Sequence, residues 1–298
     1  MSPKDILLAG LIAVAWGFNF VVIKVGLQNF PPLLFSALRF TLAAVPLVFF
    51  LPRPAVSWRI ILGIGTVLGV IKFSLLFVGM DLGVSAGLAS LLLQSQAFFT
   101  LILAALILHD RPTGGQIAGV FVAFCGIALV ATSVDAGFTV TGLVLLLGAG
   151  LAWGFSNIIM RHAGPVNMLN LMVWVSLVPS VPMLILSLLI EGADADRQAI
   201  AALNWYGVGA VLYVAYVATI LGFAGWGYLI SRHGAGQVAP FSLLVPIFGM
   251  LSSALILGES FGPARLAGAA LVLVGLLMTV IRKPRQRPGA TQALPPGA

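Results

Sequence analysis

Charged residues are scarce in this chain of 298 residues. Asp, Glu, Lys and Arg together make up only 8% of it, whereas 60% of the residues are hydrophobic. A soluble domain carries roughly 25% charged residues, because its surface must be hydrated. The composition therefore excludes an ordinary water-soluble protein and predicts an integral membrane protein, for which lipid is the main solvent.

Cysteine and histidine are also scarce. Cys125 is the only cysteine and lies within an apolar run, so a disulfide framework and a cysteine-rich metal site are both excluded. The three histidines, His109, His162 and His233, all fall in connections between apolar runs. We therefore expect no metal and no cofactor.

Acidic residues are missing from the middle of every apolar run. Asp81, Asp110 and Glu259 all map to the ends of such runs. Carboxylates inside the membrane commonly form the proton relay of a pump, so their absence gives no support to a proton-driven mechanism of that kind. Lys72 is the remaining buried titratable group that proton coupling could use.

Long apolar runs are abundant. Each is about 20 residues long, which at 1.5 Å per residue crosses a hydrocarbon core of about 30 Å. We count ten of them, which predicts an all-α membrane protein with ten transmembrane helices. The expected spans are Ile6–Gly26, Pro32–Leu51, Ile60–Met80, Ser85–Leu108, Gly114–Ala131, Gly142–Met160, Leu169–Ile190, Trp205–Ser231, Gln237–Leu257 and Pro263–Ile281.

The basic residues predict the orientation of these spans. If the N-terminus is cytoplasmic, the cytoplasmic connections and tails hold nearly all of the lysine and arginine outside the spans, and the opposite side holds only Arg197 and Arg265. This distribution follows the positive-inside rule. It predicts a multi-pass protein of a bacterial inner (plasma) membrane with both termini in the cytoplasm. It also explains the net charge of +7 without a nucleic-acid partner.

Two sequence motifs occur twice. Ala15-Trp16-Gly17-Phe18 returns as Ala152-Trp153-Gly154-Phe155, and Ala105-Leu106-Ile107-Leu108-His109-Asp110 aligns with Ala254-Leu255-Ile256-Leu257-Gly258-Glu259. We therefore divide the chain into a first five-helix repeat (1–136), a second five-helix repeat (137–282) and a basic, disordered cytoplasmic tail (283–298). Because five is odd, the second copy enters the membrane from the opposite side. This predicts two inverted repeats around a central cavity, the arrangement used for alternating access.

Three longer motifs resemble those of a known family. They are Trp16-Gly17-Phe18-Asn19-Phe20-Val21-Val22-Ile23-Lys24-Val25-Gly26-Leu27, the segment from Ala86 to Thr100, and Val238-Ala239-Pro240-Phe241-Ser242-Leu243-Leu244-Val245-Pro246. With these motifs the chain resembles the ten-span EamA-type exporters of the drug/metabolite transporter superfamily, over all but the residues after Ile281. The resemblance implies a central cavity lined by the first, third, fourth, sixth, eighth and ninth spans.

The resemblance also implies the substrate class. Related exporters carry amino acids, one type cysteine and O-acetylserine and another type aromatic amino acids. The opening motif is slightly closer to the first type, but the resemblance does not settle which amino acid or metabolite is carried. A broader drug or metabolite carrier stays open as an alternative. The expected partners are a small-molecule substrate and the lipid bilayer, and the oligomeric state cannot be read from the sequence.

Three basic residues fall within the expected spans. Lys24 and Arg39 lie near enough to the outer surface for their long side chains to reach the lipid headgroups. Lys72 lies about 20 Å from the cytoplasmic side, close to the midplane, where reaching the surface is difficult. We expect Lys72 either to attract the carboxylate of an amino acid or to bond backbone carbonyls at a helix break.

Other polar and aromatic residues at membrane depth are candidates for the substrate pathway. Trp16 and Asn19 share a helix face, and Trp153 and Asn157 repeat this pairing approximately in the second half, where Ser156 is aligned with Asn19. A hydrated cavity and helix packing explain these pairs equally well.

Two further pairs complete the candidates. On a continuous helix Gln94 and Gln96 point in nearly opposite directions, so we expect one to line the pathway and the other to bond a neighbouring helix. Tyr213 and Tyr216 are one turn apart and could hold a substrate ammonium or an aromatic ring, or simply pack.

Two other functional classes compete with a transporter. An intramembrane enzyme needs convergent acid, base, nucleophile or metal groups at membrane depth, and the sequence offers none. A channel needs a ring of charges or a filter-like glycine motif, and neither is evident. The sequence therefore predicts an exporter of amino acids and related small metabolites, and not an enzyme.

Overall fold

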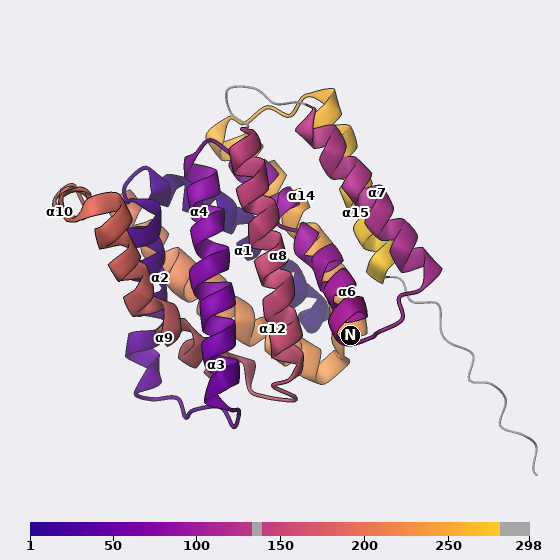
Figure 1. The fold of residues 1–298 in the computed structure, drawn as a ribbon, viewed down its shortest axis with the longest axis horizontal. Coiled ribbons are helices and arrows are strands. Elements are labelled where there is room, and N and C mark those ends of the chain that lie inside the picture. Colours follow the sequence, from indigo (N-terminus) through magenta and orange to yellow (C-terminus); the bar gives the residue numbers. More distant parts are fainter. Residues whose placement is uncertain (133–138, 281–298) are drawn as a thin grey trace, which may run out of the picture.

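The computed structural model describes residues 1–132 and 139–280, and every regular element in these ranges is a helix. Nine helical segments there are long and apolar enough to cross a membrane, and Pro32–Val48 is a shorter apolar helix. These ten segments correspond to the ten expected spans, so the all-helical prediction is confirmed (Figure 1). The boundary that we placed between the two halves, at residues 136 and 137, and the basic tail lie outside the described residues.

The first half contains five of these segments. In chain order they are α1 (Pro3–Leu27); α2 (Pro32–Val48); α3 (Trp58–Ile64), η1 (Gly65–Lys72) and α4 (Phe73–Asp81); α5 (Ala86–Leu92) and α6 (Ser95–Ile107); and α7 (Gly114–Ala131). Local sequence explains several of the helix starts. Ser2 accepts a hydrogen bond from the backbone N–H of Asp5 and Pro3 stands in the first turn of α1, while Thr113 and Gln116 form a capping box on α7.

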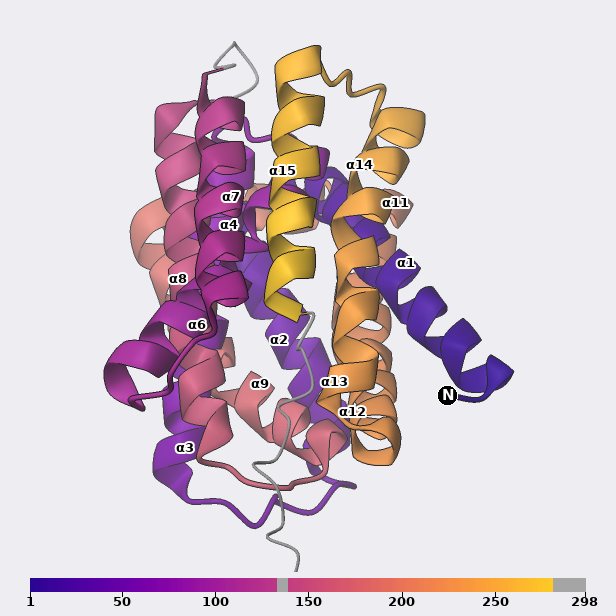
Figure 2. The ribbon, with the colours of Figure 1, turned by 90° about the vertical axis from the view of Figure 1, so that its right-hand side faces the viewer.

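The second half contains the other five. They are α8 (Val140–Arg161); α9 (Met168–Leu186), η2 (Ser187–Gly192) and α10 (Ala193–Ala201); α11 (Trp205–Leu212), η3 (Tyr213–Leu221) and α12 (Gly222–His233); α13 (Ala235–Val238), η4 (Ala239–Leu243) and α14 (Leu244–Leu257); and α15 (Pro263–Val280). The first turn of α1 and the last turn of α15 lie toward the same end of the bundle, as an even number of crossings requires (Figure 2).

Irregular backbone occurs in five of the segments that the sequence predicted as continuous helices, one of them the seventh, which ends in the π-helical stretch η2. The third and eighth segments contain the π-helical stretches η1 and η3, and the ninth contains the 3₁₀ turn η4, which holds Pro240 near its start. Proline has no N–H to donate and clashes with the preceding turn, so it breaks the α-helical hydrogen-bond pattern. The fourth segment breaks at Leu93 and Gln94, between α5 and α6. Such interruptions are often found at functional sites.

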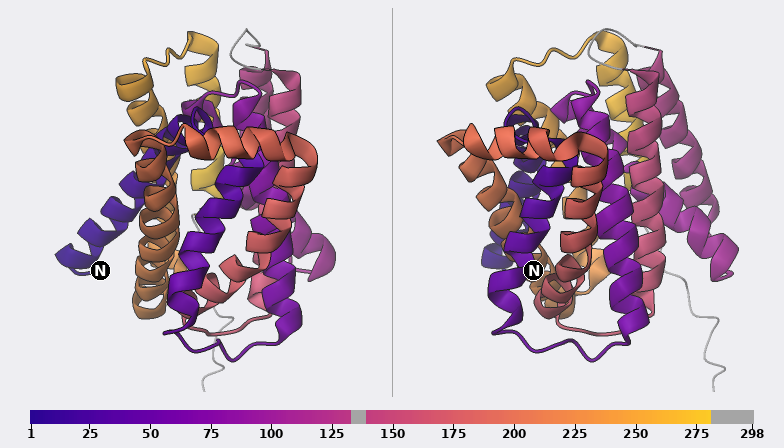
Figure 3. Two further views of the ribbon diagram at one scale, coloured as in Figure 1. Left: turned by 90° about the vertical axis from the view of Figure 1, so that its left-hand side faces the viewer. Right: turned by 60° about the vertical axis from the view of Figure 1, so that its left-hand side comes forward.

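The connection after α9 differs from expectation. We predicted a loop from residue 191 to residue 204. The structure instead has helical backbone as far as Ala201, in η2 and then in α10, which follow one another with a change of direction. Gly192 has φ +94°, a conformation that glycine adopts without steric cost, and there the chain turns so that α10 lies across one end of the bundle (Figure 3).

Glycine allows α7 and α15 to pack at close range, and the two helices run side by side (Figure 2). A Cβ atom on Gly119 would lie 2.6 Å from the carbonyl oxygen of Gly275, and one on Gly126 would lie 2.6 Å from that of Gly268. Small residues bring helix backbones together in this way in membranes, where helix association depends on close packing.

Candidate functional site

Lys72 is buried inside the bundle. It ends η1, and only 3% of its surface is exposed. Its Nζ lies 3.3 Å from the ring centroid of Phe73 and 4.7 Å from that of Trp153 on α8. Within the part of the chain that the structure describes, no hydrogen-bond acceptor contacts this ammonium. The backbone carbonyls that we considered as an alternative partner therefore do not hold it.

Arg39 on α2 is also buried, with 3% exposure. The expectation that it reaches the headgroups is wrong, because its side chain points into the bundle. Its Nη2 donates to Thr219 Oγ1 on η3 at 3.0 Å, and its Cζ lies 3.8 Å from the ring centroid of Phe73. Arg39 Nε and Nη1 are buried and have no hydrogen-bond partner.

Lys24 behaves differently from these two. Its Nζ donates at 2.8 Å to the carbonyl oxygen of Met80, in the last turn of α4. Carbonyls at a helix C-terminus carry partial negative charge, so they suit a cation. Lys24 therefore joins α1 to α4 near one end of the bundle and contributes no charge to its middle.

The carboxylates that the structure describes lie at segment ends, away from both buried cations. Glu259 accepts from the backbone N–H groups of Ala86 and Gly87, and Glu191 accepts from those of Leu33 and Leu34. At the opposite ends of the helices Asp110 pairs with Arg161 at 2.6 Å, and Asp5 lies 2.9 Å from His233. Among the described residues, then, Lys72 and Arg39 have no carboxylate partner.

Trp16 and Tyr213 join α1 to the π-helical stretch η3. Trp16 Nε1 donates to the carbonyl oxygen of Ala218 at 2.9 Å, and the Tyr213 hydroxyl donates to that of Ala15 at 2.9 Å. Trp16 also contacts the ring of Trp226, with centroids 5.2 Å apart. Both residues thus serve helix packing in this conformation, one of the two roles that the sequence left open.

Gln94 and Gln96 both bond neighbouring segments. Gln94 Nε2 donates to the carbonyl oxygen of Ser242 in η4 at 3.2 Å, which joins the irregular parts of the fourth and ninth segments. Gln96 Oε1 accepts from Asn157 Nδ2 on α8 at 2.8 Å, and Asn157 also donates to Thr100 at 3.0 Å. The helix break before Ser95 changes the directions expected for these side chains on a continuous helix.

Asn19 and Ser156 stand at aligned positions of the two halves, and both keep a buried polar atom without a partner. These atoms are Asn19 Oδ1 and Ser156 Oγ. Such atoms are costly to bury, and a bound water or ligand is a common explanation. Tyr216 contacts neither of them and lies against an apolar cluster that includes Ala43 and Val173.

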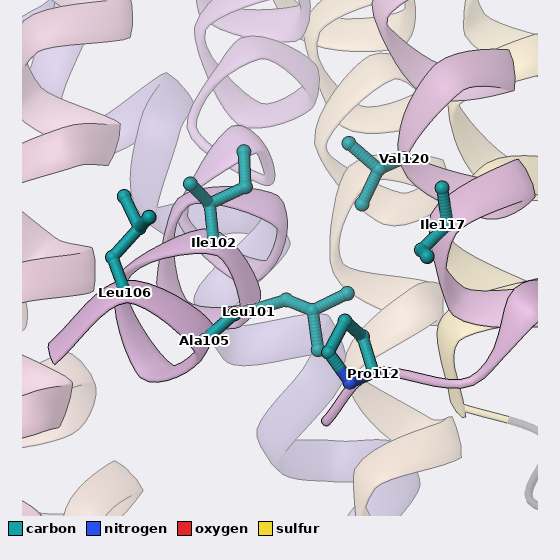
Figure 4. Close-up of a pocket in the computed structure, with 7 residues that line it drawn as sticks. All are labelled: Leu101, Ile102, Ala105, Leu106, Pro112, Ile117 and Val120. Carbon is teal, nitrogen blue, oxygen red and sulfur yellow. The ribbon is translucent and has the colours of Figure 1, made fainter. Parts of the chain in front are cut away.

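Two hollows lie away from these central residues. A cavity of about 480 Å³ lies where the connection between α8 and α9 meets α12, with Met160, Asn167 and Ser231 in its wall. A smaller crevice of about 190 Å³ separates α6 from α7 and is lined only by apolar side chains, including Leu101, Ile102 and Ile117 (Figure 4). An apolar crevice offers no group to bind a charged substrate, whereas the first cavity gives a partly polar opening at one end of the bundle.

The chemistry of the central residues is that of binding. Two cations, aromatic rings and amides can hold an anion by charge and hydrogen bonding, and within residues 1–132 and 139–280 no cluster of three or more metal-ligating side chains occurs. The sequence predicted Lys72 and Trp153 as pathway residues, but not Phe73 or Thr219. Arg39 was noted as a rare charge within an apolar run and was assigned to the outer surface, although that rarity could equally have marked it as a site residue.

The sequence matches known transporters over nearly its whole length. The model of the EamA-like transporter family matches residues 4–132 and again residues 140–281. The chain is 43% identical over 286 residues to a "Probable amino-acid metabolite efflux pump" of Salmonella typhimurium, with 94% of this chain and 96% of the relative covered. It is 40% identical over 286 residues to a protein of the same name from Escherichia coli, with the same coverage.

More distant similarities extend to another named exporter and to a solved structure. A "Probable terminal-alkyne amino-acid exporter" of Streptantibioticus cattleyicolor is 26% identical over 278 residues, with 90% of each chain covered. One crystal structure superposes with a TM-score of 0.67 at 15% sequence identity, and the match covers 97% of this chain and 100% of the other. At that identity the likeness supports the fold alone.

Proposed function

The chain belongs to the EamA-like transporter family, and from this membership we propose that it exports amino acids and related small metabolites across a bacterial inner membrane by alternating access. One observation carries the proposal: the 43% identity with a probable amino-acid metabolite efflux pump extends over 94% of this chain. The site residues agree with this role, since an amino acid brings a carboxylate and the centre of the bundle offers cations.

Alternating access requires two halves that can rearrange about a central site. The family model matches residues 4–132 and 140–281 separately, which supports the proposed repeat. The contacts are also reciprocal: α1 packs on α14, and α8, its counterpart in the second half, packs on α6. The π-helical stretches η1 and η3 interrupt corresponding segments.

In this proposal the conformation described here is closed toward one face by contacts at the segment ends. Glu259, Glu191 and Lys24 make their bonds to backbone groups at the face that we assign as the outer one. The partly polar cavity beside Met160 and Ser231 lies at the opposite face, which we assign to the cytoplasm together with both termini. Breaking the outer contacts while closing the inner cavity would complete the cycle.

Counterflow in proteoliposomes tests the function. Vesicles containing the purified protein are loaded with unlabelled amino acid, and uptake of the labelled compound is followed for a panel that includes cysteine, O-acetylserine and aromatic amino acids. We expect saturable exchange of at least one member, recovered chemically unchanged. Flux that shows neither saturation nor counterflow would indicate a channel, chemical conversion would indicate an enzyme, and the absence of flux for every compound would contradict the proposal.

A further inference from the structure

We propose that Arg39 and Lys72 together bind the anionic group of the transported molecule, and that this pair selects carboxylates with a net negative charge over zwitterionic amino acids. The inference rests on the proposed function, because it defines the substrate class of the same transporter. It adds Arg39 to the substrate site. It also restricts the proposed substrates to amino-acid metabolites whose net charge is negative.

Arg39 and Lys72 place two like charges in the interior of the bundle. Arg39 and Lys72 are each only 3% exposed. Buried charges are normally paired, because the cost of removing an ion from water is large. The chain has eight acidic residues, and none of them falls in the middle of a span. A bound anion would supply the missing counter-charge.

Several hydrogen-bond donors of these two cations are unused within the described residues. Arg39 Nη2 donates to Thr219, while Nε and Nη1 are buried and have no acceptor among residues 1–132 and 139–280. Among the described residues the Lys72 ammonium has no hydrogen bond, and it lies over the rings of Phe73 and Trp153. An aromatic face attracts a cation but does not accept all of its hydrogen bonds. A purely structural arginine or lysine would be expected to have acceptors for these protons.

Both cations lie against the same aromatic ring. The guanidinium carbon of Arg39 lies 3.8 Å and the ammonium of Lys72 lies 3.3 Å from the centroid of Phe73. The two cations come from different segments, α2 and η1, so the fold brings them together. Thr219, which fixes Arg39, stands in η3 at the same spacing from Trp205 as Lys72 has from Trp58. The site thus joins two irregular segments that correspond in the two halves.

The charge of the site selects the charge of the ligand. A zwitterionic amino acid brings an ammonium close to two cations and finds no carboxylate at membrane depth to hold it. An amino acid with an acylated amine, or with a second carboxylate, brings negative charge that its own ammonium does not cancel. A membrane potential that is negative inside also drives such an anion outward.

Matched compounds test this selection. Binding of N-acetylserine and serine, and of aspartate and asparagine, is measured by calorimetry on the purified full-length protein in detergent. Aspartate and asparagine have the same size and differ in net charge, whereas N-acetylserine differs from serine both in net charge and by its acetyl group. We expect the wild-type protein to bind the anionic member at least about tenfold more tightly, as charge complementarity at a desolvated site implies. Equal binding within both pairs would overturn the inference.

Variants test whether the two cations are the cause. R39Q and K72Q should each reduce the anionic preference to about threefold or less, since each removes one of the two charges. R39K keeps the charge and should retain the preference at weaker affinity. R197Q removes an exposed arginine on α10 and is the matched control, for which we expect wild-type ratios. If R39Q and K72Q both keep the full preference, the two cations do not select the ligand.

Loss of folding must be separated from loss of binding. T219V keeps both charges but removes the hydroxyl that holds Arg39, so it should weaken binding of both anionic compounds while the preference persists. If R39Q fails to fold, R39K and T219V decide: unchanged affinity for the anionic compounds in both variants would contradict the proposal. A merely structural Arg39 would alter the melting temperature without altering the anionic-to-zwitterionic ratio.

Transport distinguishes this inference from the proposed function. In proteoliposomes an imposed potential, negative inside, should accelerate efflux of N-acetylserine and leave efflux of serine unchanged. If zwitterionic amino acids are exchanged as well as the anionic compounds, the function stands and this inference fails. If the anionic preference is seen in binding but no compound is exchanged, the site stands and the proposed function fails.

Discussion

The carboxylate of Glu259 covers the start of α5, where Oε1 accepts from the backbone N–H of Ala86 at 2.7 Å and Oε2 accepts from that of Gly87 at 3.0 Å. The first N–H groups of a helix have no partner within the helix and carry partial positive charge, so a carboxylate suits them. Because Glu259 lies in the connection between α14 and α15, this contact holds the fourth and ninth segments together at the face that we assign as outer.

Replacing Glu259 by Gln removes the charge and one of the two acceptors. Charge-assisted hydrogen bonds contribute roughly 1.5–3 kcal/mol each, so we expect E259Q to lower stability by about 2 kcal/mol. The melting temperature of the purified protein measures this effect. Asp81 is exposed at the end of α4, and no hydrogen bond to it occurs among the described residues, so D81N is the matched control and should melt like the wild type. Equal melting of E259Q and D81N would show that the cap contributes nothing.

Gly126 sets the distance between α7 and α15. A Cβ atom there would lie 2.6 Å from the carbonyl oxygen of Gly268, so G126A forces the helices apart. Overpacking of this kind costs typically 1–3 kcal/mol. Gly114 lies at the start of α7, where a Cβ atom meets nothing within 4 Å, so G114A is the control. We expect thermal unfolding at lower temperature for G126A alone, and similar curves for the two variants would contradict the packing.

Asn157 and Gln96 should be energetically coupled. Their amide groups form a 2.8 Å hydrogen bond between the partly buried faces of α8 and α6, and losing such a bond costs about 0.5–1.5 kcal/mol. We expect N157A and Q96A each to be destabilised, and the double variant to lose less than the sum of the two. A double-mutant cycle on denaturation free energies measures this coupling. Additive losses would show that the hydrogen bond contributes little.

Lys72 should matter for substrate affinity, whereas Lys24 should matter for helix docking. K72Q removes a buried central cation. For a compound that the wild-type protein exchanges, we expect the KM of counterflow to rise about tenfold in this variant, which corresponds to a loss of roughly 1.4 kcal/mol of binding free energy. K24Q removes the bond to the carbonyl oxygen of Met80 at a segment end, and we expect its KM to stay near the wild-type value. An unchanged KM in K72Q would exclude Lys72 from the substrate site.

Much of the fold could be predicted because lipid imposes a simple rule. A segment of sufficient length and hydropathy must become a helix in a bilayer, since its backbone groups find no water to bond. The expected span Gly114–Ala131 therefore coincides with α7. The helix α10 escaped prediction because it is polar and lies across the end of the bundle, where no such rule applies.

The candidate site was only partly predictable. Lys72 was identified because a charge at membrane depth is costly and needs a reason. From the sequence we assigned Arg39 to the lipid headgroups, because a long side chain near a helix end can reach them. In the structure its side chain instead donates a hydrogen bond to Thr219 inside the bundle. The sequence predicted that one of Gln94 and Gln96 bonds a neighbouring helix and that the other lines the pathway, whereas in this conformation both form hydrogen bonds to neighbouring segments.

The sequence by itself determined the solvent of this protein, its helical character, the approximate position of ten apolar segments and the family to which the chain belongs. Those properties depend on composition and on residues close together along the chain. The tertiary structure alone decided that Arg39 and Lys72 share the ring of Phe73, and that Gln96 bonds Asn157. Such contacts join segments far apart in the sequence, and their geometry follows from how the helices pack and where each one breaks, which local sequence does not specify.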